Sequence, residues 1–335
     1  MKLNIKSDAR YVVLGSGSWA TAITKLLTNN LSKVGWYVRE REFADHISTH
    51  GHNPQFLSSV EFNPEKLNLY TDVNEAVHNA DVIIVVIPSA YAEVWMGGLA
   101  ESLENKFIVS AVKGIIPSSN KTILEYFNES FGADFENMGI VTGPCHAEEI
   151  ALERLSYLTF ACKQEGNARA IAEKFSVDFL RTITCTDVHG TEYAAILKNI
   201  YAVAVGICHG LGYGDNFQAV LVSNAYVELK KFLEEVFPTE REPGSSAYLG
   251  DLLVTCYSQF SRNRTFGTMI GKGYRVRDAQ LEMSMVAEGY YACKCMHDLN
   301  RNYKVSLPIA ESLYRVLYER GDAKKEVARL TTMLQ

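Results

Sequence analysis

The feature that most constrains the fold of this chain is a glycine-rich turn near its start. Residues 15–20 read Gly-Ser-Gly-Ser-Trp-Ala, between a short apolar run and a helical pattern. In such a strand–turn–helix unit, Gly15 permits the tight turn, Gly17 lets a ligand approach the backbone, and Ala20 allows close helix–strand packing. The free N–H groups at the helix N-terminus favour an anion. The turn therefore predicts a pyrophosphate site on a Rossmann-type unit.

The first 187 residues alternate short β-branched runs with helical segments, which is typical of a doubly wound parallel sheet. The run Val82–Ile87 is wholly apolar and ends at Pro88, as expected of a central strand buried on both faces. The predicted strands are Tyr11–Leu14, Val34–Val38, Val82–Ile87, Phe107–Val112, Gly139–Thr142, Tyr157–Ala161 and Thr182–Cys185. We therefore expect residues 1–187 to form an α/β dinucleotide-binding domain.

From residue 188 onward the β-branched runs disappear and long helical patterns replace them. The predicted helices span 188–210, 215–236, 286–303 and 308–334, and residues 237–246 read as a loop rich in proline, glycine and serine. Because 335 residues exceed one ordinary core, we expect an all-α second domain over 188–335. A cleft between two domains is a favoured ligand site.

Composition narrows the class of protein. The net charge of −6 without a basic block argues against a nucleic-acid partner. Seven cysteines, an odd number with no C-x-x-C pair, fit reduced thiols in the cytoplasm. The start lacks a signal-peptide core, and the apolar stretch 193–208 is too short and too polar for a membrane span. We expect a cytoplasmic protein, and the sequence allows a homodimer.

One lysine stands in an unusual setting. Lys198 is the only charged residue between Glu192 and His209, within a helix that is apolar on all sides. Burying an unpaired ammonium costs several kcal/mol by order of magnitude, so the group needs a partner or a lowered pKa. Asp251, alone in another apolar run, is a candidate partner. The alternative is a lysine whose stem reaches along the helix to solvent.

Two charged clusters suggest anion binding. Ser261-Arg-Asn-Arg264 combines guanidinium, amide and hydroxyl groups that match a phosphate, although such clusters also form solvated turns. Arg39-Glu-Arg41 lies at the tip of the second predicted strand, where an acid commonly binds the ribose of NAD. Strand alternation turns Glu40 away from the face that Arg39 uses. This arrangement predicts that NADPH is accepted at least as well as NADH.

These segments, in this order, resemble NAD(P)-dependent glycerol-3-phosphate dehydrogenase of the bacterial type. The resemblance runs nearly end to end and rests on the ordered set rather than on any one motif. Its motifs are Gly15-Ser-Gly-Ser-Trp-Ala-Thr-Ala22, Ala111-Val-Lys-Gly114, Thr142-Gly-Pro-Cys-His-Ala147, Leu197-Lys-Asn199, Gly210-Leu-Gly-Tyr-Gly-Asp-Asn216, Leu249-Gly-Asp-Leu252, Ser261-Arg-Asn-Arg264 and Val286-Ala-Glu-Gly289.

The resemblance implies reversible reduction of dihydroxyacetone phosphate to sn-glycerol 3-phosphate for phospholipid synthesis, with NAD(H) or NADP(H) and no metal. It implies that Lys198 is the catalytic proton donor and acceptor. The substrate residues it implies are Lys113, Gly143, Cys145, Lys198, Asp251, Ser261, Arg262 and Asn263. The dinucleotide residues it implies are Gly15, Gly17, Ser18, Trp19, Arg39, Lys113, Ala147, Arg262, Val286 and Glu288.

The sequence departs from the family pattern at four positions. Cys145 replaces a serine or threonine, Glu148 replaces a lysine, Ala20 replaces a glycine and His209 replaces an acid. The first change puts a substrate hydrogen bond in doubt, because a thiol is a weak donor.

Four other interpretations stay open. The chain could be another 2-hydroxyacid or hydroxymethyl dehydrogenase, or a non-catalytic dinucleotide sensor. His146 is a second candidate acid–base residue, ranked below Lys198. A zinc site is a further alternative, but its three candidate ligands are loosely spaced and lack a nearby cysteine. These candidates are His46, His50 and His52.

Overall fold

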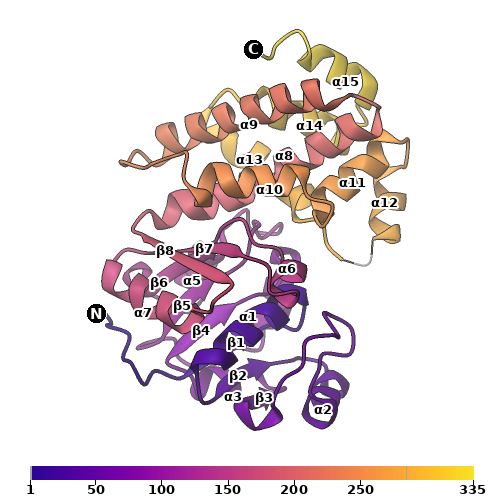
Figure 1. The fold of residues 1–335 in the computed structure, drawn as a ribbon. Coiled ribbons are helices and arrows are strands. Elements are labelled where there is room, and N and C mark those ends of the chain that lie inside the picture. The colour runs from indigo at the N-terminus through magenta and orange to yellow at the C-terminus, as the bar shows by residue number, and fades with distance from the viewer. Residues whose placement is uncertain (1, 284) are drawn as a thin grey trace. The chain divides into compact units, whose positions relative to one another are not determined.

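A computed structural model describes residues 2–283 and 285–335. The chain forms two compact units (Figure 1). The first contains the chain up to Val112 together with Ile123–Val188, and the second contains Lys113–Thr122 and His189–Gln335. The segment Lys113–Thr122, which lies inside the first predicted domain, therefore packs with the second unit.

The first unit is an α/β fold around one eight-stranded sheet. Its strands are β1 Tyr11–Leu14, β2 Val34–Tyr37, β3 Leu67–Tyr70, β4 Val82–Val85, β5 Phe107–Ser110, β6 Met138–Thr142, β7 Ser156–Cys162 and β8 Leu180–Cys185. Their order across the sheet is β3-β2-β1-β4-β5-β6-β7-β8. The chain order reverses between β1 and β4, which is the point where sheets of this kind bind ligands at the carboxyl ends of their strands.

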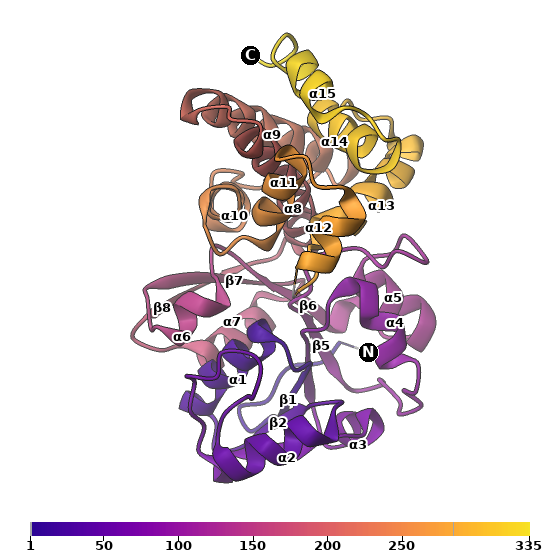
Figure 2. The ribbon, with the colours of Figure 1, turned by 90° about the vertical axis from the view of Figure 1, so that its right-hand side faces the viewer.

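Helices cover both faces of this sheet (Figure 2). Those of the first unit are α1 Ser18–Asn30, α2 Arg41–His50, α3 Val73–His78, α4 Ala92–Met96, α5 Ile123–Phe131, α6 Ala147–Ala151 and α7 Glu165–Phe175. In Figure 2, α1, α6 and α7 lie on one face, and α3 and α5 lie on the other. The central strands β1 and β4 are buried along their whole length, which explains their uninterrupted apolar runs.

The sheet differs from the predicted one in two respects. The predicted parallel pairing is confirmed for every neighbouring pair of strands except β6 and β7, which pair antiparallel. Their connection contains only the short helix α6, whereas a parallel return needs a longer crossover. β3 was not predicted, because this four-residue edge strand alternates buried Leu67 with exposed Asn68 and lacks an apolar run.

The second unit is helical. Its helices are α8 Val188–Gly210, α9 Asp215–Val236, α10 Asp251–Tyr257, α11 Arg262–Gly271, α12 Val276–Glu282, α13 Glu288–Tyr303, α14 Pro308–Tyr318 and α15 Ala323–Leu330, with one π-helical turn at Ser246–Gly250. The helix predicted over 308–334 is broken at 319–322. Arg320 has a φ of 58° there, and Asp322 caps the next helix through the Lys325 N–H group.

Helix α8 lies at the centre of the core of this unit, and α11 packs against it so closely that the backbones of the two helices are in contact. A Cβ added at Gly206 of α8 would lie 2.2 Å from the carbonyl oxygen of Arg264. A Cβ added at Gly267 of α11 would lie 2.1 Å from that of Val203. A residue with a Cβ fits at neither position unless one of the helices moves. The two glycines therefore allow the short distance between α8 and α11.

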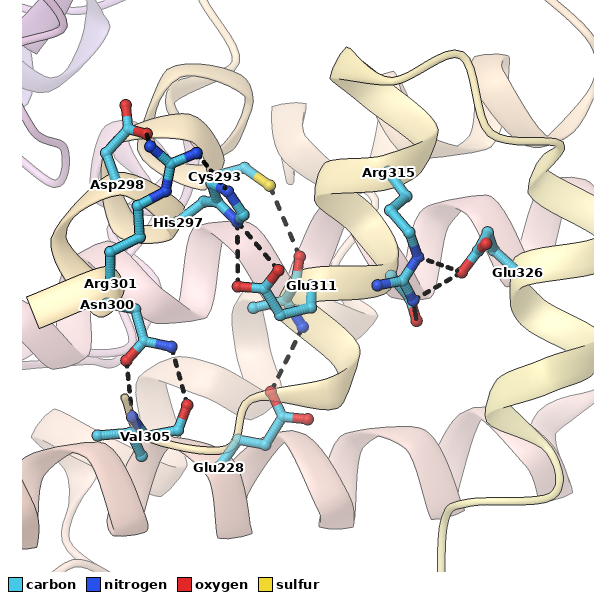
Figure 3. A network of polar contacts seen from close by, with 12 residues as sticks. Glu228, Cys293, His297, Asp298, Asn300, Arg301, Val305, Glu311, Arg315 and Glu326 are labelled. Atoms are coloured by element: carbon cyan, nitrogen blue, oxygen red, sulfur yellow. Dashed lines mark hydrogen bonds and ion pairs between the residues drawn. The ribbon is translucent and has the colours of Figure 1, made fainter. Parts of the chain in front are cut away.

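Polar contacts fix the outer helices of the same unit (Figure 3). Glu228 of α9 accepts a hydrogen bond from the Ile309 N–H group at 2.6 Å, which caps the start of α14. His297 of α13 contacts Glu311 of α14 at 2.9 Å. Arg315 of α14 pairs with Glu326 of α15 at 2.7 Å.

Within residues 2–283 and 285–335, no helix combines the length and the apolar character needed to cross a bilayer.

Candidate functional site

The glycine-rich turn of the first unit has the geometry that its sequence predicts. Gly15 follows β1 with a φ of +135°, and a Cβ there would lie 2.5 Å from the Val86 carbonyl oxygen. Gly17 is the N-cap of α1, and a Cβ there would meet no protein atom of the described chain within 4 Å. A ligand can therefore approach the backbone at Gly17, which fits the pyrophosphate of a dinucleotide. Ser18 and Trp19 follow in the first turn of α1.

Two side chains that sequence reasoning missed hold this turn in place. The indole N–H of Trp36, in β2, donates to the Gly15 carbonyl at 2.7 Å. The amide of Asn53 donates to the Ser16 carbonyl at 2.9 Å and to the Thr21 hydroxyl at 3.0 Å. Both are fully buried, so the conformation of the turn is fixed from two sides.

The charged residues after β2 differ from the prediction. Arg39 lies over the Trp95 ring at 5.0 Å and pairs with Glu40 at 3.1 Å. The other carboxylate oxygen of Glu40 accepts a hydrogen bond from the Ser16 hydroxyl at 3.5 Å, inside the glycine-rich turn. The expectation that Glu40 turns away from Arg39 is therefore wrong. Strand β2 ends at Tyr37, so its alternation does not extend to these residues.

The remaining predicted residues of the first unit follow β6. Gly143 has a φ of +128° and turns the chain next to the carbonyl oxygen of Tyr157. Cys145 is buried in the apolar core of the unit. His146 is the N-cap of α6, and Ala147 is the first residue of that helix.

The second unit brings three of the predicted residues together. Lys198 of α8 is 3% exposed and Asp251 of α10 is 1% exposed, so the alternative of a lysine reaching solvent is wrong. The Lys198 ammonium donates a hydrogen bond to Asp251 Oδ1. The Lys113 Nζ lies 4.0 Å from Asp251 Oδ2, so one carboxylate contacts two ammonium groups.

Burial and charge perturb the proton affinity of this lysine. Desolvation lowers the pKa of Lys198 to about 7, the Asp251 carboxylate opposes that change, and the Lys113 ammonium adds to it. Thr255, one turn further along α10, donates to the Asp251 carbonyl at 2.6 Å and fixes the start of that helix. An ammonium with a pKa close to neutrality in a fixed position has the properties of a general acid and base.

A chain of amide groups connects this pair to α11 and α13. The Gly289 N–H donates to Asn263 Oδ1 at 2.9 Å, and Asn263 Nδ2 donates to Asn199 Oδ1 at 2.9 Å. Asn199 Nδ2 in turn donates to the Lys113 carbonyl at 2.7 Å. The chain fixes the backbone of Lys113 relative to α8. Sequence reasoning gave Asn199 no role, although its position beside Lys198 in an apolar helix was a signal.

The other predicted residues of this unit lie at helix starts. The Ser261 hydroxyl caps α11 by accepting the Arg264 N–H at 3.3 Å. Arg262 is the first residue of α11, and its guanidinium contacts the Met285 sulfur at 3.4 Å. Val286 precedes α13, and Glu288 is its first residue.

The three histidines after β2 stack on one another: the ring centres of His46 and His50 are 4.2 Å apart, and those of His46 and His52 are 4.8 Å apart. Over the described parts of the chain, no group of three or more histidine, cysteine or acidic side chains is placed to hold a metal ion.

Comparison with known proteins identifies the family. Residues 11–168 match the N-terminal part of NAD-dependent glycerol-3-phosphate dehydrogenase, and residues 187–328 match its C-terminal part. The chain belongs to the NAD-dependent glycerol-3-phosphate dehydrogenase family. This membership confirms the resemblance given by the ordered motifs.

Individual relatives agree with this assignment. A glycerol-3-phosphate dehydrogenase (NAD(P)+) of Exiguobacterium is 36% identical over 324 residues, which cover 96% of this chain and 95% of the relative. One from Chlorobium limicola is 32% identical over 96% of both chains. The crystal structure of the Coxiella burnetii glycerol-3-phosphate dehydrogenase superimposes with a TM-score of 0.88 at 27% identity, over 97% of this chain and 99% of that one. The α/β unit followed by a helical unit is thus the architecture of this family.

Proposed function

We propose that this chain reduces dihydroxyacetone phosphate to sn-glycerol 3-phosphate, and catalyses the reverse oxidation, with NAD(H) or NADP(H). The observation that carries the proposal is the buried pair of Lys198 and Asp251 with Lys113 beside it. A buried ammonium whose pKa is lowered to about 7 can both give and take a proton near neutral pH.

The proposed chemistry follows from these three side chains. Reduction of a ketone places negative charge on its oxygen, and the bound dinucleotide supplies the hydride. The Lys198 ammonium stabilises that charge and donates the proton, and in the reverse direction its neutral amine accepts one. Asp251 keeps Lys198 oriented, and Lys113 adds a second positive charge.

We assign the phosphate of the substrate to the start of α11. The Arg262 guanidinium is exposed there, and its fork of donors matches phosphate oxygens. The Asn263 amide uses its oxygen and one N–H within the protein, which leaves one N–H for a ligand. We further assign Gly143, Cys145 and the Ser261 hydroxyl to the substrate site, as the resemblance implies.

We assign the dinucleotide to the glycine-rich turn, because Gly17 leaves its backbone accessible and the N-terminus of α1 favours the pyrophosphate. The residues proposed to hold it are Gly15, Gly17, Ser18, Trp19, Arg39, Lys113, Ala147, Arg262, Val286 and Glu288.

The proposal is tested by the decay of NADH absorbance with dihydroxyacetone phosphate as the only acceptor. The Lys198→Met variant should lose about 10²–10⁴-fold in kcat, which is the usual contribution of general acid catalysis. Its NADH affinity, measured by fluorescence, should stay unchanged. The matched control is Lys272→Met, at an exposed lysine that follows α11. A Lys198→Met kcat within tenfold of the wild-type value would exclude the proposed acid role.

We also propose that the enzyme works in the cytoplasm and supplies glycerol 3-phosphate to phospholipid synthesis. All seven cysteines are free thiols, which fits a reducing compartment.

A homodimer is the proposed assembly. It is supported by the exposed apolar residues Val220 and Val227 on α9, and light scattering of the purified protein tests it.

A further inference from the structure

The carboxylate of Glu40 lies next to the glycine-rich turn. One of its oxygens accepts a hydrogen bond from the Ser16 hydroxyl at 3.5 Å, and Ser16 lies between the two glycines of that turn. The Glu40 side chain is 37% exposed, so it faces both the turn and solvent. An acid at this point of a Rossmann-type unit is placed to accept hydrogen bonds from the ribose hydroxyls of a dinucleotide.

Local structure holds Glu40 in this position. Its backbone carbonyl accepts the Phe43 and Ala44 N–H groups at the start of α2, which fixes the main chain. Within the described residues, the Glu40 side chain makes no capping hydrogen bond to α2. It accepts the hydrogen bond from the Ser16 hydroxyl instead. Ser16 is itself anchored through its carbonyl by the buried amide of Asn53.

The neighbouring arginine is already engaged. The Arg39 Nε and Nη2 atoms lie 3.2 Å and 3.1 Å from the same Glu40 oxygen. Its guanidinium also lies over the Trp95 ring at 5.0 Å. The Arg39–Glu40 pair has no net charge, so it offers little attraction to a phosphate. A 2′-phosphate would have to break this pair and approach a carboxylate.

We propose that Glu40 determines the cofactor specificity of this enzyme and that the chain binds NADH in preference to NADPH. The inference rests on the dinucleotide site proposed above. It reverses the expectation from sequence, which placed Arg39 rather than Glu40 at the ribose. Glu40 accepts hydrogen bonds from the ribose hydroxyls of NADH, and the same carboxylate repels the 2′-phosphate of NADPH.

The test compares the binding of NADH and NADPH to the full chain by isothermal titration calorimetry without substrate. Wild-type protein should bind NADH at least tenfold more tightly than NADPH, which corresponds to about 1.4 kcal/mol. The Glu40→Gln variant should reduce this ratio to about threefold or less, because it removes the charge and keeps the shape. Glu42→Gln is the matched control, since Glu42 is exposed in the first turn of α2 and loses the same charge.

Each result decides between distinct conclusions. Equal or tighter binding of NADPH by the wild-type protein would overturn the proposal, as would a Glu40→Gln ratio equal to the wild-type ratio. An equal change in Glu42→Gln would also overturn it, because the effect would then come from net charge alone. If neither dinucleotide binds, the dinucleotide site itself is wrongly placed. The wild-type ratio is decisive even if a variant fails to fold.

Discussion

Replacing Gly267 with alanine should separate α8 from α11 and weaken both stability and activity. The added Cβ would lie 2.1 Å from the Val203 carbonyl oxygen and 3.0 Å from the Ile207 nitrogen. Both are backbone atoms, so relief requires one helix to move by about 1 Å, and overpacking of this kind costs roughly 1–3 kcal/mol. The higher helix propensity of alanine returns at most about 1 kcal/mol. We expect a net loss of about 1–2 kcal/mol.

The functional effect follows from the position of Gly267 on α11. Asn263 lies one turn earlier, and its 2.9 Å hydrogen bond to Asn199 of α8 would be stretched by the same movement. That bond is part of the chain that fixes the Lys113 carbonyl. The kcat of Gly267→Ala should therefore decrease at temperatures where the protein is still fully folded.

Thermal unfolding followed by circular dichroism measures the first effect, and steady-state kinetics measures the second. A loss of about 1–2 kcal/mol should lower Tm by about 2–8 °C for a unit of this size. Gly166→Ala is the matched control, because Gly166 lies in helix α7 and a Cβ there meets no described atom within 4 Å. Its Tm should be unchanged or higher. A Gly267→Ala protein with the Tm and kcat of the wild type would refute the helix-contact argument.

Three further predictions concern charge. Arg262→Ala should reduce kcat/KM for dihydroxyacetone phosphate far more than for unphosphorylated dihydroxyacetone, since a charge-assisted hydrogen bond contributes about 1.5–3 kcal/mol; equal losses would assign Arg262 another role. Because the pKa of Lys198 is about 7, kcat/KM for reduction should decrease and that for oxidation should increase as pH rises through this value. Asp251→Asn should move both midpoints to lower pH, because the Asp251 charge raises that pKa, and unchanged pH profiles would contradict the pairing. Burial raises the pKa of Glu228 to about 8, above the usual value for an unfolded chain, so the stability it contributes is complete at low pH and is lost as pH rises through about 8. The Tm of Glu228→Gln should accordingly depend less on pH than the wild-type Tm between about pH 5 and 8, and parallel Tm curves would exclude this role.

The sequence was informative where burial leaves a local signature. The strand β4 was predictable because burial on both faces requires an unbroken apolar run. Lys198 and Asp251 were predictable for the opposite reason. Each is a single charge in an apolar segment, and a buried charge needs a partner of opposite sign.

Residues that act over a long separation in the chain left no such signature. Asn53 contacts Ser16 and Thr21 across more than thirty residues, and its own surroundings in the sequence are those of an ordinary polar loop. Asn263 was predicted as a phosphate ligand from its place in a charged cluster. Its contacts with Asn199 and Gly289 depend on how α8, α11 and α13 pack, which no single segment encodes.

The interpretation of Arg39 and Glu40 depended on where one strand ends. Alternation of side chains applies only to extended backbone, and the sequence Val34-Gly-Trp-Tyr-Val38 predicts a strand that reaches the arginine. In the structure, β2 ends at Tyr37 and α2 begins at Arg41. The chain bends between them, so Arg39 and Glu40 reach the same side and pair. A difference of one residue in the end of a strand thus reverses the charge expected to face the ribose, and with it the expected choice between NADH and NADPH.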